Sequence, residues 1–195
     1  PLLASLMVTV ASALALAGTY VAVPTIDRAT AIALHVVYAA YGFMGMLALG
    51  LSYIVVPMFV LAAAPDARRA LASCALAAAA LALAGAAAFD ISPRALRVTA
   101  IAAGAAAAGL HLQLMHAALR AGMRRELGPS FRLVRVAWAL LPVSLIAGLA
   151  VALDAPIAGM SLYFGLLLIG GWLLTFLLGI LQRIVPFLAA MHAGP

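Results

Sequence analysis

Four histidines are the side chains of this sequence whose type and placement best suit chemistry. A neutral imidazole binds haem iron, copper or zinc through one ring nitrogen while a hydrogen bond holds the other. His35 lies in an apolar stretch with Tyr38 one helical turn further on, and His111 lies near the middle of another apolar stretch. A polar group in such surroundings is costly and indicates either a function or a hydrogen bond to a neighbouring helix. We therefore take His35 and His111 as candidate metal or haem ligands.

The other two histidines occupy less telling positions. His116 follows His111 by five residues, about 140° around a helix, so the pair cannot hold one ion from a single helix face. It stays a candidate cofactor ligand, with an interfacial hydrogen bond as the alternative. His192 follows Pro186 and is expected at a membrane surface, where a histidine usually has no special role.

Few other side chains could carry a reaction. Cys74 is the only cysteine, which excludes an intrachain disulfide and a cysteine-based metal cluster. The eight methionines could serve cuprous copper, but they do not cluster, and packing is their more ordinary role. The acidic residues fall at predicted loop edges or in an arginine-rich loop: Asp27, Asp66, Asp90, Glu126 and Asp154. A proton channel or carboxylate-driven transporter is therefore disfavoured, and no nucleophile elbow or phosphate loop is present.

The elements that must position these histidines are membrane helices. Of the 195 residues, 68% are hydrophobic and 8% are charged, against roughly a quarter charged in soluble domains. The apolar runs lack the alternation of barrel strands, and open strands cannot satisfy their backbone in lipid. The sequence predicts an all-α bundle of six transmembrane helices in one domain, 1–195. The spans are expected at 2–24, 31–63, 70–89, 95–121, 133–153 and 157–190.

The arginines predict how this bundle is oriented. An even number of spans puts both termini and the loops after the second and fourth spans on one side. That side carries eight of the eleven basic residues, all arginines, and the positive-inside rule then makes both termini cytoplasmic. A bacterial-type inner (cytoplasmic) membrane is the expected location. Nucleic acid is not an expected partner, because these arginines are dispersed between apolar spans.

The second and sixth segments share a parallel repeat. Gly42-Phe43, Gly50 and Pro57 match Gly171-Trp172, Gly179 and Pro186 at the same spacings, while the position equivalent to His35 is Phe164. At 100° per residue, His35, Gly42, Tyr53 and Pro57 fall in a stripe about 60° wide. Glycines there either let helices approach closely or leave room for a flat cofactor. Both interpretations remain open.

The same residues resemble a known family. The run His35-Val-Val-Tyr38 to Gly42-Phe43, Gly50, Tyr53 and Val56-Pro57 resembles a helix of haem-copper oxidase subunit I, and the tail from Gly171-Trp172 to Arg183-Ile-Val-Pro186-Phe resembles a second. The resemblance covers about 55 residues and implies a haem site at the histidine, with Tyr38 and Gly42 beside it. The family's core has twelve helices and at least six metal-binding histidines, so a binuclear oxygen-reducing centre is not expected here.

Three functions follow as hypotheses. The first is a b-type haem protein that passes electrons between a cytochrome or quinone partner and another membrane subunit. The second is a copper-handling protein for import or oxidase assembly, and the third is a cofactor-free structural subunit of a membrane complex. At 1.5 Å per residue, His35 lies about 10 Å from Arg28 and His111 about 26 Å from Arg94, a mismatch of about 15 Å. One haem between His35 and His111 would therefore need a strongly shifted helix.

Overall fold

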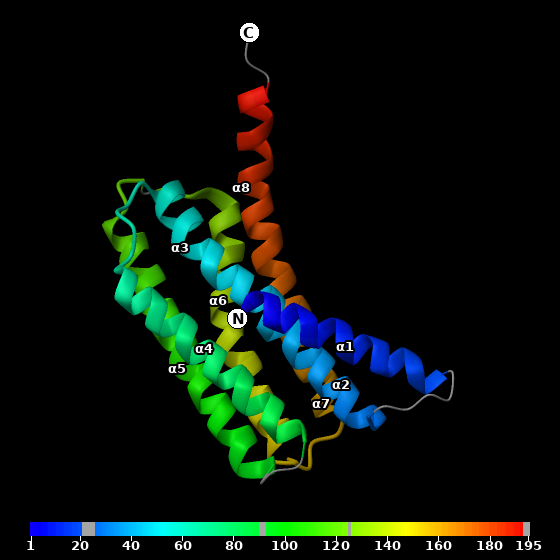
Figure 1. Cartoon of the computed structure of the whole chain (residues 1–195). Coiled ribbons are helices and arrows are strands. Elements are labelled where there is room, and N and C mark those ends of the chain that lie inside the picture. The colour runs from blue at the N-terminus through cyan, green and yellow to red at the C-terminus, as the bar shows by residue number, and fades with distance from the viewer. Residues whose placement is uncertain (21–25, 90–92, 125, 193–195) are drawn as a thin grey trace.

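The computed structural model describes residues 1–20, 26–89, 93–124 and 126–192, and every element within these ranges is a helix (Figure 1). Six of the described helices are long and apolar enough to cross a membrane, which confirms the all-α, six-span prediction. The chain is a multi-pass membrane protein. Residues 21–24 of the predicted first span, together with Asp90 and Arg125, lie outside the described residues.

Four spans are single α-helices and two are composite. The single helices are α1 (Leu2–Tyr20), α4 (Ala67–Ala88), α5 (Pro93–Ala121) and α6 (Gly128–Ala152). The second span consists of α2 (Arg28–Val37), the π-helical segment η1 (Tyr38–Gly45) and α3 (Met46–Val60). The sixth span consists of α7 (Met160–Gly165), the π-helical segment η2 (Leu166–Leu174) and α8 (Thr175–His192).

Several spans begin earlier than the hydropathy alone predicts. The second and third spans start at Arg28 and Ala67, three residues before the expected 31 and 70. In each case an aspartate caps the helix: Asp27 accepts a hydrogen bond from the Thr30 backbone N–H, and Asp66 accepts one from that of Arg69. A cap satisfies amides that the helix itself leaves unpaired, so the helix includes charged residues of its first turn.

The π-helical segments give the sequence repeat a structural counterpart. Shifting η1 by 129 residues, the offset that superimposes Gly42 on Gly171, gives 167–174, and η2 spans 166–174. A π-turn widens the helix by one residue and leaves the register of the flanking turns displaced. The two spans therefore have the same break at the same place, and the breaks meet: Tyr41 of η1 packs against Trp172 of η2, with ring centroids 5.6 Å apart.

The core lies where α6 meets both composite spans and α5. Its fully buried side chains include Val56, Met115, Phe131, Val134 and Leu168. At one end the Arg183 guanidinium lies over the rings of Phe59 and Phe131, 5.7 and 5.9 Å from their centroids. This stacking joins α8 to α3 and α6.

The edges of the bundle differ from this core. α1 lies obliquely across α2, and its buried residues are small: Ser5, Ser12 and Ala15. The last turns of α8 project beyond the other helices in Figure 1, and Val185, Phe187 and Met191 are exposed there. The C-terminal ends of α3, α5 and α8 lie at one end of the molecule, opposite the α6–α7 loop (Figure 1).

Candidate functional site

His35 is held by the first helix. Its Nδ1 lies 3.1 Å from the Thr9 carbonyl oxygen and 3.4 Å from the Ser12 hydroxyl, both on α1. A carbonyl only accepts, so Nδ1 carries the proton and Nε2 keeps its lone pair in the neutral ring. The ring is half-buried. This is the arrangement that orients a ligating imidazole, and it also fastens α1 to α2.

Tyr38 and Gly42 have other partners than those expected from the sequence. The Tyr38 hydroxyl donates to the Leu81 carbonyl of α4 at 2.9 Å rather than to His35. The space beside Gly42 is taken by α1, because a Cβ there would come within 2.9 Å of the Ser5 Cβ. Close approach of two helices is therefore what Gly42 provides in this structure.

His111 lies at the centre of a buried polar cluster. It is 2% exposed, and its Nδ1 has no hydrogen-bond partner. The rings of Tyr53 and Trp138 meet it edge-on, with centroids 5.2 and 6.3 Å away. The Tyr53 hydroxyl and Trp138 Nε1 are likewise buried without partners. Three helices, α3, α5 and α6, thus bring together three rings that each carry an unpaired polar atom.

The buried serines show that this cluster is unusual within the described residues. Ser52 and Ser144 donate to carbonyls of their own helices, and Ser73 donates to the Ala107 carbonyl at 2.9 Å. Ser73 lies beside the Tyr53 hydroxyl, but the two hydroxyls do not meet in hydrogen-bonding geometry. Buried polar atoms without partners typically cost about 1–3 kcal/mol each, so an unpaired group of three calls for an explanation.

His35 and His111 do not come together. His111 packs against Tyr53, which follows His35 by eighteen residues along one continuous span, a rise of about 27 Å. A single iron cannot take both as axial ligands, which agrees with the depth mismatch predicted from the sequence. Among the described residues no group of three or more His, Cys, Asp or Glu side chains gathers to hold a metal ion.

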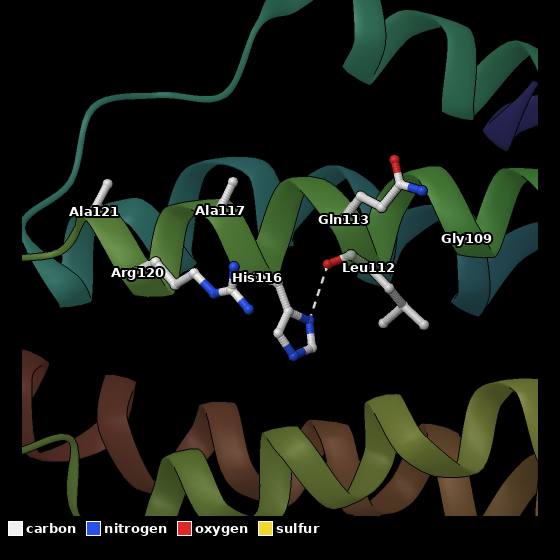
Figure 2. A pocket seen from close by; sticks show the side chains of 7 residues that line it. All are labelled: Gly109, Leu112, Gln113, His116, Ala117, Arg120 and Ala121. Carbon is white, nitrogen blue, oxygen red and sulfur yellow. Dashed lines mark hydrogen bonds between the residues drawn. The ribbon is translucent and has the colours of Figure 1, made fainter.

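His116 lines a groove along α5. A cavity of about 760 Å³ opens beside seven residues of this helix, which Figure 2 labels. His116 points to the same side as Leu112, whose carbonyl accepts from its Nδ1 at 3.2 Å, while Gln113 points the other way and accepts a bond from Arg69 of α4. Arg120 lies one turn further on. His192 is exposed and bonds the Leu188 carbonyl of its own helix.

Three residues near the candidate histidines were not assigned to a site from the sequence. They are Tyr53 and Trp138 beside His111, and Arg120 in the groove beside His116. Tyr53 lies on the predicted glycine stripe, which was a usable signal. Trp138 carries no signal beyond being one of two tryptophans, because its place beside His111 depends on how α5 and α6 pack. Arg120 is one of the eight arginines on the predicted cytoplasmic side, which were interpreted only as topology signals.

Comparison with protein-family models, with curated proteins and with solved structures finds no match to this chain. The likeness to haem-copper oxidase helices therefore stays a prediction from the sequence.

Proposed function

We propose that this protein is a b-type haem-binding, electron-transferring subunit of a membrane redox complex, with His35 as an axial ligand. The observation that carries the proposal is the hydrogen bond from His35 Nδ1 to the Thr9 carbonyl of another helix. His116 and His192 also bond carbonyls, but each uses the carbonyl four residues earlier in its own helix. Only at His35 does the bond fix the ring relative to a second helix.

The surroundings of His35 suit a single axial ligand of a haem iron. Thr9 orients the ring, Ser12 lies beside the same nitrogen, and Nε2 is left for iron. A bound haem would accept and release one electron at a potential set by burial and hydrogen bonding. The remaining histidines lie far along the bundle, so a second ligand would come from a partner subunit. A cytochrome or a quinone would be the redox partner.

The proposal includes a location. The arginine-rich end, with Arg68, Arg69, Arg120 and Arg124, would face the cytoplasm of a bacterial-type cell under the positive-inside rule. Both termini would then be cytoplasmic, and His35 would lie toward the outer surface.

Reduced-minus-oxidised spectra of the purified protein test the proposal. We expect a b-type band that His35→Gln abolishes, because glutamine can still donate to the Thr9 carbonyl but is not a haem ligand of the kinds proteins use. His192→Gln and His116→Gln are matched controls that should keep the band. A colourless protein made with haem in excess, or a His35→Gln variant with undiminished absorbance, would overturn the assignment. Stoichiometric copper without a Soret band would favour copper handling.

A cofactor-free structural subunit is the second candidate, and the glycine contacts favour it. Ser5 occupies the space beside Gly42, and Ser130 and Val134 of α6 crowd Gly179. These glycines serve helix packing. If the purified protein is free of pigment and metal but stays bound to a membrane partner, this function replaces the first.

A further inference from the structure

The groove along α5 changes character along its length. Near the arginine-rich end it is lined by His116, Arg120 and the amide-bearing Gln113, all exposed. Gln113 is bonded to Arg69 at 3.2 Å, so a second guanidinium lies at this level. Among the described residues that line the groove, none is acidic. This end therefore suits an anion.

Towards the other end the groove becomes apolar. A second cavity of about 330 Å³ shares Gly109 and Leu112 with the first and continues between α5 and α6. Its walls include Ala105, Pro142 and Leu145. A Cβ on Gly109 would have nothing within 4 Å, so the junction of the two parts is open. The two cavities adjoin along one groove, which has a cationic end and an apolar end.

We propose that this groove binds an anionic phospholipid, with its phosphate at Arg120 beside His116 and an acyl chain along α5 and α6. Charge complementarity selects the headgroup, since guanidinium N–H groups donate hydrogen bonds to phosphate oxygens. From Arg120 to Ala105 the helix rises about 22 Å, which exceeds the roughly 15 Å that half a bilayer core requires. The polar end of the groove also lies at the depth expected for a lipid headgroup. Arg69, which is bonded to Gln113, is in the first turn of α4, where that span begins.

Native mass spectrometry of the full chain from micelles tests the site, with phosphatidylglycerol and phosphatidylcholine as probes. We expect one phosphatidylglycerol to be retained more tightly than phosphatidylcholine. Arg120→Gln should weaken phosphatidylglycerol at least about tenfold, since a hydrogen bond to a charged group is lost. Gly109→Leu should weaken both lipids by filling the open junction. Arg94→Gln, an exposed arginine at the far end of the same helix, is the matched control and should change neither.

Three outcomes would overturn the proposal. Equal retention of the two lipids would mean that the cationic end selects nothing. Displacement of phosphatidylglycerol by millimolar inorganic phosphate would assign the polar end to a free anion instead of a lipid. A dimer that Gly109→Leu dissociates would mean that a second copy of the chain covers the groove. None of these measurements depends on haem, so the lipid site and the proposed function can fail separately.

Discussion

The second and sixth spans have the same design and different surroundings. Each contains a π-helical segment, then a glycine and then a proline, at an offset of 129 residues. In an apolar 18-residue stretch of the second span, 56% of the residues are buried, whereas the corresponding share in the sixth span is 28%. The second carries His35 and Tyr53 where the sixth carries Phe164 and Gln182. One backbone pattern thus serves a more enclosed helix in one copy and a more exposed helix in the other.

The π-helical segment occurs in both spans, whereas a histidine occurs near it in the second span alone. A π-turn is often found at functional sites because it re-aims side chains. Here η2 has the turn without a histidine, and its Trp172 fills the space beside Gly45 of η1. The breaks therefore have a packing role common to both copies, and only the second span adds a histidine near the break.

The glycines after the two breaks should give the largest difference. A Cβ on Gly179 would lie 2.9 Å from the Ser130 carbonyl oxygen, whereas one on Gly50 meets nothing within 4 Å. We expect Gly179→Ala to lower the free energy of unfolding by about 1–3 kcal/mol through overpacking. Gly50→Ala should leave it unchanged or raise it by up to about 1 kcal/mol, since alanine is the better helix former. Denaturant titration in mixed micelles measures both, and equal losses would break the comparison.

The polar cluster of the second span should respond to a single hydroxyl. Tyr53→Phe removes an unpaired buried oxygen and keeps the ring against His111, so we expect unfolding to cost about 1 kcal/mol more. Tyr41→Phe is the matched control. This variant loses the 3.3 Å hydrogen bond between the Tyr41 and Ser144 hydroxyls, so we expect its free energy of unfolding to fall by about 1 kcal/mol. A loss of stability in Tyr53→Phe would reveal a bound partner within the cluster.

The break in the sixth span has a local support that can be removed. The Thr175 hydroxyl donates to the Gly170 carbonyl of η2 at 2.8 Å, whereas the equivalent residue after η1 is Met46. We expect Thr175→Val to lower the free energy of unfolding by about 1 kcal/mol. Thr99→Val is the control, because the exposed Thr99 bonds a carbonyl within an ordinary α-helix. If Thr175→Val leaves the free energy of unfolding unchanged, then η2 does not need this hydrogen bond.

The starts of the two spans should give the smallest effect. Asp27 caps the second span, while Gly159 before the sixth offers no side-chain cap. Contacts with the Thr30 side chain and backbone N–H lower the pKa of Asp27 from its usual 3.8. A lowered folded-state pKa means that the capping stability is present above pH 3.8 and is lost as the pH falls through the folded value.

Hydrogen exchange at the amides of the first turn of α2 measures this cap. Protection should fall on acidification in the wild type, and the fall should be smaller in Asp27→Asn, which caps without titrating. An identical acid dependence in the two proteins would mean that the carboxylate does not act as the cap.

Much of the architecture could be predicted because lipid imposes strict conditions on the chain. Runs of about twenty apolar residues must be helical in lipid, so the six spans could be predicted from hydropathy. The boundaries at Arg28 and Ala67 were missed by three residues, since capping by Asp27 and Asp66 extends helices into charged sequence. The π-helical segments were not predicted, although the repeat that they share was visible in the glycine and proline spacing.

The amino-acid sequence alone determined that this chain is a six-helix membrane protein with an internal repeat, because hydropathy and spacing are properties of each segment by itself. Which polar groups meet was decided only by tertiary structure. His35 is bound by Thr9, and His111 is enclosed by Tyr53 and Trp138, through contacts between helices distant in sequence. Those contacts depend on helix rotation, tilt and the π-turns, and a change of one residue in register turns a side chain by about 100°.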